Sequence, residues 1–249
     1  MESYIQQGDC LLLMETIPDK SIDMILCDLP YGLTQNLYDK PIPFEKLWAN
    51  YKRIIKPNGV IALFGQGQFF IDLVESNRKW YRYDIVWDKV LTSGFLNAKR
   101  MPLRRHEQVA VFYQKLPTYN PQFSEGQPLH GRGKTYVNKP IKNHNYGKFK
   151  NTEDVRKGST EKYPTSIIRE SKAHPSKAIH PTEKPVKLLE YLIKTYTNEG
   201  EIVLDNCMGC GSTVIACMRT KRKYIGFELA GEYFLTAQER IIKENMKGE

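Results

Sequence analysis

The tetrapeptide Asp28-Leu29-Pro30-Tyr31 combines the groups needed to hold a flat substrate that carries an amino group. It follows a largely apolar run at residues 22–27, interrupted only by Asp23, that is typical of a buried strand. Pro30 has no N–H, so the carbonyls of Asp28 and Leu29 are left free to accept hydrogen bonds. Tyr31 can stack on the substrate while Asp28 and a carbonyl accept its N–H protons. The segment therefore predicts an active site at a strand end, with an ordinary Asp-x-Pro turn as the alternative.

A second set of residues suited to ligand binding lies between residues 202 and 218. The run 202–205 is typical of a strand, a loop with Gly209 and Gly211 follows, and 214–218 has helical apolar spacing. Glycines permit a close approach to the backbone, and the N–H groups of a helix start point outward, so the arrangement predicts a nucleotide cradle. Only two glycines are present, so the phosphate-binding fingerprint with three is not met.

An acidic residue follows the next predicted strand. The strand at 223–227 ends at Glu228, at about the spacing where an acid meets ribose hydroxyls in a βαβ unit. A glycine turn with an acid one strand later fits an adenosine without a pyrophosphate. A tight turn in a nucleotide-free α/β sheet is the alternative.

Together these segments resemble the amino-group DNA methyltransferases that use S-adenosylmethionine. Asp28 to Tyr31 resembles their catalytic tetrapeptide, and Asp205 to Thr213 resembles their cofactor loop. The catalytic segment comes first, as in the circularly permuted β class. The segment His180-Pro181-Thr182-Glu183-Lys184-Pro185 is similar to the one that leads into the cofactor half, and Gly8-Asp9-Cys10 resembles the element whose acid faces the adenine.

The resemblance implies a role for each matching residue. It makes Asp28, Leu29, Pro30 and Tyr31 catalytic. It places these residues around the cofactor: Asp9, Cys10, Asp28, His180, Thr182, Lys184, Pro185, Asp205, Cys207, Gly209, Gly211, Ser212, Thr213, Glu228 and Leu229. Leu29 replaces a proline that is commoner in the family, but it keeps the backbone carbonyl that the role needs. Asn206, Cys207 and Cys210 replace the commoner Pro, Phe and Ser, so the wall beside the methionine part is expected to be looser.

Most of the net charge lies in one stretch. The chain carries +9, and residues 115–178 hold 13 Lys and Arg against 5 Asp and Glu, which leaves +8. Prolines and glycines break any periodicity there, and aromatic residues lie between the cations, which favours contacts to phosphates and bases. We expect 115–178 to be a DNA target-recognition insertion in a methyltransferase domain formed by 1–114 and 179–249. A solvated basic loop is the alternative.

Ten cations are candidate DNA contacts. Four lie in a predicted surface loop at 91–105, and six lie in the insertion: Lys99, Arg100, Arg104, Arg105, Arg132, Lys134, Lys139, Lys142, Lys148 and Lys150. Backbone phosphates bind such side chains independently of sequence. For the four cations at 91–105, a merely solvated loop is the alternative.

Length and composition fit one catalytic domain with an insertion. The 249 residues can bury a sizeable core, no stretch is apolar for long enough to span a membrane, and no signal peptide is recognisable, so a cytoplasmic location is expected. Five cysteines, an odd number, indicate free thiols in a reducing compartment. The pair Cys207-x-x-Cys210 lacks a second pair or a His cluster, so no metal site is expected.

The predicted fold is a doubly wound, Rossmann-like α/β methyltransferase sheet in circularly permuted order. Further elements expected are a helix at 44–55, ended by Pro57 and Gly59, and strands at 60–64, 83–87 and 108–113. The predicted function is methylation of adenine N6 in double-stranded DNA. Cytosine N4 methylation and a non-catalytic DNA-binding protein that has kept the fold are the alternatives. Methylation of RNA or of a protein amide is a third, which the large basic insertion disfavours. A homodimer and a cognate restriction nuclease stay open as partners.

Overall fold

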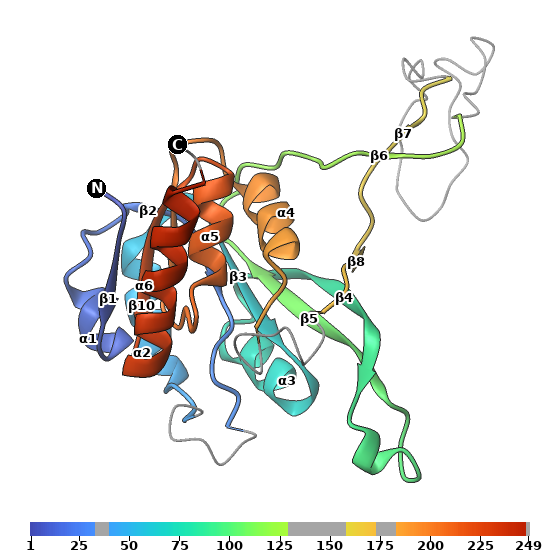
Figure 1. The fold of residues 1–249 in the computed structure, drawn as a ribbon, viewed down its shortest axis with the longest axis horizontal. Helices are drawn as coiled ribbons and strands as arrows, with labels where there is room; N and C mark the ends of the chain where they lie inside the picture. The colour runs from blue at the N-terminus through green and yellow to red at the C-terminus, as the bar shows by residue number, and fades with distance from the viewer. Residues whose placement is uncertain (33–39, 129–157, 173–182, 248–249) are drawn as a thin grey trace. The chain divides into compact units, whose positions relative to one another are not determined.

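The computed structural model describes residues 1–32, 40–128, 158–172 and 183–247. The chain divides into two compact units, one formed by Met1–Asn120 with Ser166–Glu249 and the other by Pro121–Thr165 (Figure 1). The helices are α1 (Cys10–Glu15), α2 (Phe44–Ile54), α3 (Gly67–Ser76), the 3-10 turn η1 (Phe95–Asn97), α4 (Val186–Tyr196), α5 (Ser212–Arg219) and α6 (Gly231–Asn245). The strands are β1 (Tyr4–Gln7), β2 (Ile22–Cys27), β3 (Ile55–Gly65), β4 (Tyr81–Ser93), β5 (Arg104–Phe112), β6 (Ser124–Glu125), β7 (Glu161–Lys162), β8 (Ile167–Arg169), β9 (Ile202–Asp205) and β10 (Lys223–Glu228).

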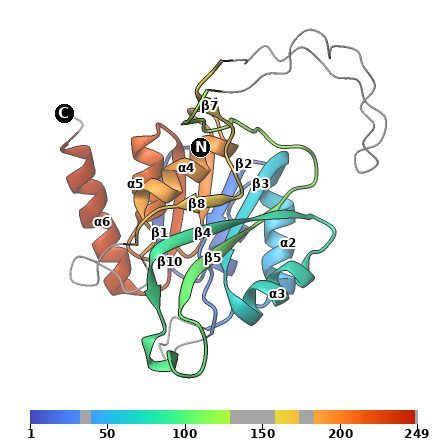
Figure 2. The ribbon, with the colours of Figure 1, turned by 90° about the vertical axis from the view of Figure 1, so that its right-hand side faces the viewer.

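Eight strands of the first unit form one sheet in the order β1-β10-β9-β2-β3-β5-β4-β8. The neighbours from β1 to β3 are parallel, β5 is antiparallel to β3 and β4, and β8 is parallel to β4. Figure 2 shows α4, α5 and α6 on one side of the sheet and α2 and α3 on the other. A mostly parallel sheet with helices on both faces confirms the predicted doubly wound α/β fold.

The parallel strands are buried on both faces. In β2, Ile25 and Cys27 belong to a core shared with α1 and α2, whereas Met24 and Leu26 belong to a core shared with α4 and α5. Successive side chains of a strand point to opposite faces, so burial on both sides requires an uninterrupted apolar sequence. This explains why 24–27 is apolar throughout, whereas Asp23, near the start of β2, is only partly buried and pairs with Lys56.

The order of the strands reverses between β2 and β9. These strands are neighbours, with Ile25 paired with Leu204. From β2 the chain continues to β3 on one side, and from β9 it continues to β10 on the other. Open α/β sheets hold ligands at such a switch point, beyond the carboxyl ends of the strands. The two loops that the sequence singles out therefore leave the sheet side by side.

The other predicted elements are present, with some changed limits. The predicted helix at 44–55 is α2. The strands predicted at 22–27, 60–64, 83–87, 108–113, 202–205 and 223–227 lie in β2, β3, β4, β5, β9 and β10, except that β5 ends at Phe112, one residue short of its prediction. Short hydrophobic patterns thus predict that these elements exist more accurately than they predict the residues at which the elements begin and end.

The predicted break at Pro57 and Gly59 is wrong, because β3 begins at Ile55 directly after α2. Ile55 pairs with Ile22, and the register then shifts before the pairing of Met24 with Val60. The extra residues are accommodated as an irregularity in a long strand, a position where proline and glycine are tolerated.

β4 and β5 extend beyond the rest of the sheet as a hairpin (Figures 1 and 2). The surface loop predicted at 91–105 is its end, because β4 runs to Ser93, η1 follows and β5 begins at Arg104. Gly94 has φ +83°, a left-handed conformation that favours glycine. Next to it, Phe95 is 79% exposed and Leu96 is 100% exposed. We call residues 94–101 the hairpin tip.

The second unit contains the short antiparallel pair β6 and β7, in which Ser124 lies opposite Lys162. The rings of Phe123 and Tyr163 lie 4.9 Å apart, centroid to centroid. The six cations predicted in the insertion lie outside the described residues: Arg132, Lys134, Lys139, Lys142, Lys148 and Lys150. Their contacts with DNA stay predictions.

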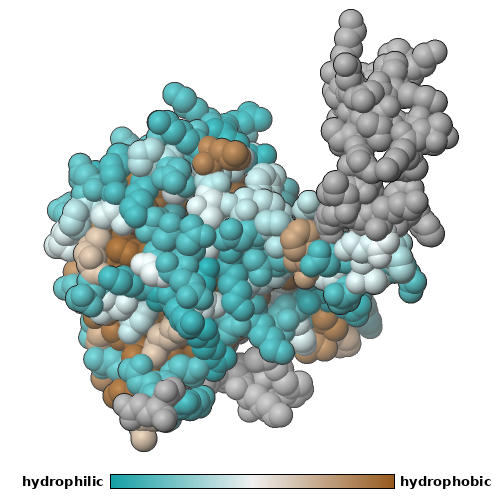
Figure 3. Space-filling view, turned by 90° about the horizontal axis from the view of Figure 1, so that it is seen from above, coloured by the Kyte–Doolittle hydropathy of each residue, from teal (hydrophilic) through white to brown (hydrophobic). Residues whose placement is uncertain are grey.

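The face of the protein seen in Figure 3 is largely hydrophilic, with hydrophobic residues in small separate groups. Scattered apolar residues are usual on a folded domain. Within the described ranges, no helix is long and apolar enough to cross a membrane.

Candidate active site

A cavity of about 580 Å³ lies at the carboxyl ends of β2 and β9. Its wall includes most of the described residues predicted to act in catalysis or cofactor binding: Asp9, Cys10, Asp28, Leu29, Pro30, Tyr31, Lys184, Asp205, Cys207, Gly209, Ser212, Thr213, Glu228 and Leu229. Pro185 and Gly211 do not line the cavity, and His180 and Thr182 lie outside the described residues. Segments from both ends of the chain therefore meet in one site.

One side of the cavity is a glycine turn held by Glu228. Gly209 has φ +53°, and a Cβ added there would meet no atom within 4 Å. The buried carboxylate of Glu228 accepts hydrogen bonds from the N–H groups of Gly209 at 2.8 Å and Ala230 at 2.7 Å. Burial raises the pKa of Glu228, although these N–H groups oppose the shift. The turn is thus fixed from behind and open toward the cavity, as a cofactor cradle requires.

Two further acids hold the loops around this cradle. Asp9 caps α1 by accepting from the Leu11 N–H at 2.8 Å. Asp205, at the end of β9, is buried and accepts from the Cys207 N–H at 3.1 Å. Burial raises the pKa of Asp205 to about 6. Both carboxylates therefore order the backbone around the cavity as well as facing it.

Asp28 is held by two hydrogen-bond donors. The Tyr31 hydroxyl donates to Oδ1 at 2.7 Å, and the Lys184 ammonium donates to Oδ2. The Tyr31 ring stacks on Phe69, with centroids 4.5 Å apart and planes at 29°. Burial, with Asp28 beside it, raises the pKa of the Tyr31 hydroxyl well above its usual value. The orientation of Asp28 is thus fixed from within the tetrapeptide and from the distant Lys184.

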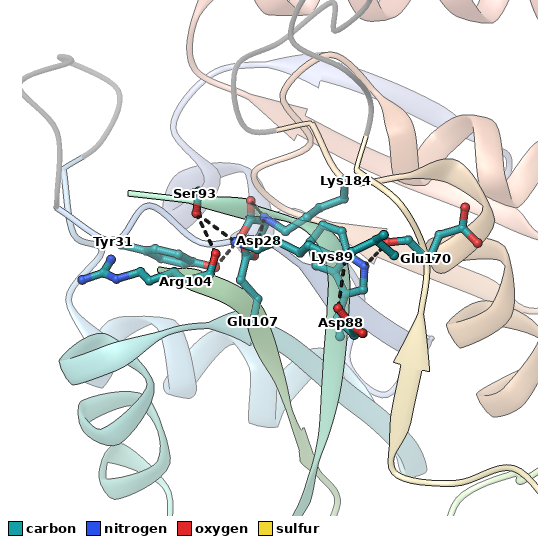
Figure 4. Close-up of polar contacts among 11 residues, drawn as sticks. Asp28, Tyr31, Asp88, Lys89, Ser93, Arg104, Glu107, Glu170 and Lys184 are labelled. Atoms are coloured by element: carbon teal, nitrogen blue, oxygen red, sulfur yellow. Dashed lines mark hydrogen bonds and ion pairs between the residues drawn. The ribbon is translucent and has the colours of Figure 1, made fainter. Parts of the chain in front are cut away.

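Lys184 belongs to a buried charged cluster that we define as Asp28, Lys89, Glu107 and Lys184 (Figure 4). The Lys184 Nζ lies 3.3 Å from Oε2 of Glu107, and the Lys89 Nζ lies 3.1 Å from Oε1 of the same carboxylate. Burial raises the pKa of Glu107, but Lys184 and Lys89 outweigh it and hold that pKa below its usual value. Burial likewise lowers the pKa of Lys184, but Asp28 and Glu107 outweigh it and raise that pKa. The cluster therefore contains three ion-pair contacts among four groups, with Lys184 between the two carboxylates.

Lys89 and Glu107 are functional-site residues that the sequence motifs do not indicate. The available signal was the alternation of buried positions, because Ile85 and Trp87 precede Lys89 at intervals of two in β4. Glu107 stands in the same relation to Val109 and Val111 of β5. Both charged groups thus point to the buried face of the sheet. The alternation pattern does not show which other strand ends lie near Lys89 and Glu107, because that depends on how strands distant in the sequence pair in the sheet.

The neighbours Glu183 and Lys184 reach different parts of the site. The resemblance assigns Lys184 to the cofactor, but the structure places its ammonium at the tetrapeptide carboxylate. Glu183 instead accepts from the Ser212 hydroxyl at 3.0 Å and pairs with Arg240 at 2.8 Å. This short segment therefore connects the start of α5 to Asp28.

The predicted DNA contacts on the hairpin are not equivalent. Arg105 makes two hydrogen bonds to Asp88, at 2.8 and 3.0 Å, which hold the pKa of Asp88 at about 2. Lys99, Arg100 and Arg104 are exposed. We infer that Arg105 is engaged within the protein and less available to a ligand than the other three.

The cysteines Cys10, Cys27, Cys207, Cys210 and Cys217 are all free, which confirms the predicted free thiols. Among the described residues, no group of three or more His, Cys, Asp or Glu could hold a metal ion.

Comparison with known proteins identifies a family and a curated relative that match this chain. The model of the N6/N4 DNA methylase family matches residues 22–239. The Type II methyltransferase M.BamHI of Bacillus amyloliquefaciens is 29% identical over 262 residues, which include 98% of this chain and 57% of that protein. The chain thus spans a little over half the length of this curated relative.

Two solved structures share the fold. The crystal structure of the M1.HpyAVI-SAM complex has a TM-score of 0.63 at 24% identity and covers 95% of this chain and 98% of that chain. The PvuII DNA methyltransferase, described as cytosine-N4-specific, has a TM-score of 0.67 at 16% identity and covers 96% and 86%. With most of the sequence matched by the family model, the chain belongs to the N6/N4 DNA methylase family.

Proposed function

We propose that this chain is a DNA methyltransferase that transfers a methyl group from S-adenosylmethionine to the exocyclic N6 of a flipped adenine. The observation that carries the proposal is that Asp28 and the Gly209 turn face one cavity. A nucleoside cofactor on the turn and a planar amine beside Asp28 would then be neighbours. Membership in the DNA methylase family supports both parts of the proposal.

The glycine-turn side of the cavity suits S-adenosylmethionine, which the related M1.HpyAVI structure is described as containing. The space beside Gly209 is open, so a ligand can approach the backbone closely. Glu228 uses one lone pair on each oxygen for a backbone N–H and retains others for ribose hydroxyls. We assign Asp9, which lines the cavity and follows the segment paired with Glu228, to the adenine side of the cofactor.

Asp28 has the orienting role. The lone pair of an exocyclic amine is delocalised into the ring, so it must be turned toward the electrophile. Asp28 and the Leu29 carbonyl would accept both N–H protons and thereby direct the lone pair. When bound, S-adenosylmethionine supplies a methyl group on a positively charged sulfur, to which the electrons of the broken carbon–sulfur bond return. The carboxylate stabilises the positive charge that develops on nitrogen until one proton leaves to water.

An aspartate in the first position of the tetrapeptide resembles the adenine-directed pattern, which favours adenine as the substrate. The cytosine N4 enzymes of the same family more often carry serine at that position. Cytosine N4 is the second candidate. It is supported by the shared fold with the PvuII methyltransferase, which is described as cytosine-N4-specific. Fold alone carries less weight here than the residue that would touch the amine.

The hairpin tip offers a surface for duplex DNA. A base can reach Asp28 only after leaving the stack. The exposed Lys99 and Arg100 suit phosphates, and the exposed Phe95 and Leu96 suit insertion between base steps. Ser93, which directly precedes the hairpin tip, lines the same cavity as Asp28, so the tip would bind beside the flipped base.

The insertion at 115–178 completes the proposal as the target-recognition region, on the strength of its +8 charge. Cytoplasmic location, a homodimer and a cognate restriction nuclease are further predictions, made from the sequence and from a relative that is described as a Type II methyltransferase.

Nucleoside analysis tests the proposal. DNA incubated with the protein and methyl-labelled S-adenosylmethionine should yield N6-methyldeoxyadenosine after digestion, and Asp28→Ala protein should yield far less. Labelled N4-methyldeoxycytidine would establish the second candidate. DNA binding without any label, with no measurable cofactor affinity, would establish a non-catalytic DNA-binding protein.

A further inference from the structure

Lys184 lies between the two carboxylates of the buried charged cluster. It donates to Oδ2 of Asp28, and its Nζ is 3.3 Å from Oε2 of Glu107. Lys89 occupies the other Glu107 oxygen at 3.1 Å. Among the described residues, Oε2 of Glu107 accepts no hydrogen bond. Oε2 of Glu107 therefore already lies within ion-pair distance of the ammonium that holds Asp28, without yet accepting a hydrogen bond from it (Figure 4).

The contact between Lys184 and Asp28 opposes the proposed reaction. The amine must donate to the carboxylate of Asp28, and positive charge develops on its nitrogen. An ammonium hydrogen-bonded to the same carboxylate competes for lone pairs and repels that charge, and such repulsion is stronger where water is excluded. Methyl transfer should thus be faster when Lys184 is not on Asp28.

The surroundings of Lys184 restrict where its ammonium can move. The residue is buried, with Nζ 5.0 Å from the centroid of the Phe64 ring, so a buried charge without a partner would be strongly unfavourable. Glu107 offers a partner within ion-pair distance. Tyr31 would still hold Oδ1 of Asp28 after such a shift.

We propose that Lys184 is a displaceable positioning residue, which holds Asp28 in place before the base amine binds and passes to Oε2 of Glu107 when the amine arrives. Glu107 is the acceptor for the displaced ammonium, and Lys89 keeps Glu107 in place. The proposal rests on the proposed function, since it concerns the same carboxylate. No proton is transferred in this step, and only hydrogen bonds are exchanged.

Single-turnover methyl transfer in three variants tests the exchange. Glu107→Gln removes the charged acceptor and leaves Lys184 on Asp28, so the rate should fall about tenfold, the effect of about 1.4 kcal/mol. Lys184→Gln removes the competing ammonium and should retain more activity than Glu107→Gln. The double variant Glu107→Gln/Lys184→Gln should recover to the rate of Lys184→Gln. Rates are taken per cofactor-binding site, so that misfolded protein does not count.

A matched control separates release of Asp28 from restoration of charge balance. Glu107→Gln/Lys89→Gln has the same net charge as Glu107→Gln/Lys184→Gln, but it leaves Lys184 on Asp28. It should stay as slow as Glu107→Gln alone. Equal recovery in both double variants would overturn the proposal, as would a Glu107→Gln/Lys184→Gln variant no faster than Glu107→Gln.

The resting contact is tested without DNA or methyl transfer. In urea denaturation, the double variant Asp28→Asn/Lys184→Gln should lose less in its midpoint than the sum of the losses of the two single variants. The reason is that each single variant already removes the same ion pair. Additive losses would overturn the proposal even if methyl transfer were observed. A wild-type protein that shows the coupling but transfers no methyl group would instead refute the proposed function.

Discussion

The buried charged cluster and the hairpin tip reverse the usual distribution of side chains. Lys89, Glu107 and Lys184 are 4%, 9% and 8% exposed, whereas Phe95 and Leu96 lie almost wholly in solvent. Buried charges are tolerated when they are paired, and the cluster pairs its members within the chain. Exposed apolar side chains lack such partners and commonly mark a contact surface. The charged cluster is therefore a site whose contacts are all supplied by the chain itself, whereas the hairpin tip is a surface whose contacts we expect DNA to supply.

The largest effect is expected from breaking a pair in the cluster. Lys89→Met leaves Glu107 with only Lys184, so the free energy of unfolding should fall by about 3–5 kcal/mol, as for other broken buried ion pairs. Urea denaturation measures the change. Lys99→Met at the hairpin tip replaces the same residue type in solvent and should leave stability unchanged. Equal effects at the two positions would remove the distinction between the regions.

Cofactor affinity should depend on the buried carboxylate that holds the glycine turn. Glu228→Ala leaves the N–H groups of Gly209 and Ala230 without their acceptor and removes the ligand proposed for the ribose. Binding of S-adenosylmethionine should weaken by about 1.5–3 kcal/mol in calorimetry. Glu232→Ala, an exposed acid on α6, is the control. Wild-type affinity in Glu228→Ala protein would show that the cofactor binds elsewhere.

The apolar residues of the hairpin tip should matter only when the target base is paired. Phe95→Ala/Leu96→Ala should slow methylation of a fully paired duplex about tenfold, because unstacking one base step costs a few kcal/mol. A duplex with a mismatched target base should be methylated at nearly the wild-type rate. Leu235→Ala/Ile242→Ala, exposed residues of α6, should affect neither substrate. An equal loss on both duplexes would contradict insertion.

The smallest effect concerns the cations around the tip. Lys99→Gln and Arg100→Gln should each reduce the slope of log affinity against log salt concentration by about 0.9 if each contacts one phosphate. Arg105→Gln should change the slope less, since Asp88 already engages that guanidinium. A larger change for Arg105 than for Lys99 and Arg100 would reverse the assignment.

The two regions also differ in how far the sequence predicts them. Asp28 to Tyr31 and Asp205 to Thr213 could be located because each combines a local strand pattern with a loop of distinctive residues. The placement of Lys184 at Asp28 could not, since that contact joins residues 156 positions apart. Nor could the meeting of Lys89 with Glu107, which depends on the antiparallel pairing of β4 with β5. The bulge in β3 depends equally on non-local register. The sequence places Phe95 and Leu96 in a loop but does not predict their exposure, because a single sequence does not show which apolar side chains stay in contact with solvent.

The central claim is that Asp28 directs a base amine within a cavity that also binds S-adenosylmethionine. Single-turnover methyl transfer by Asp28→Ala protein, measured beside its cofactor affinity, tests this most directly. The account predicts a loss of at least about 100-fold in rate with cofactor affinity unchanged, as for removal of a preorganised acceptor from a transition state. A rate within about tenfold of wild type, with intact cofactor binding, would contradict it.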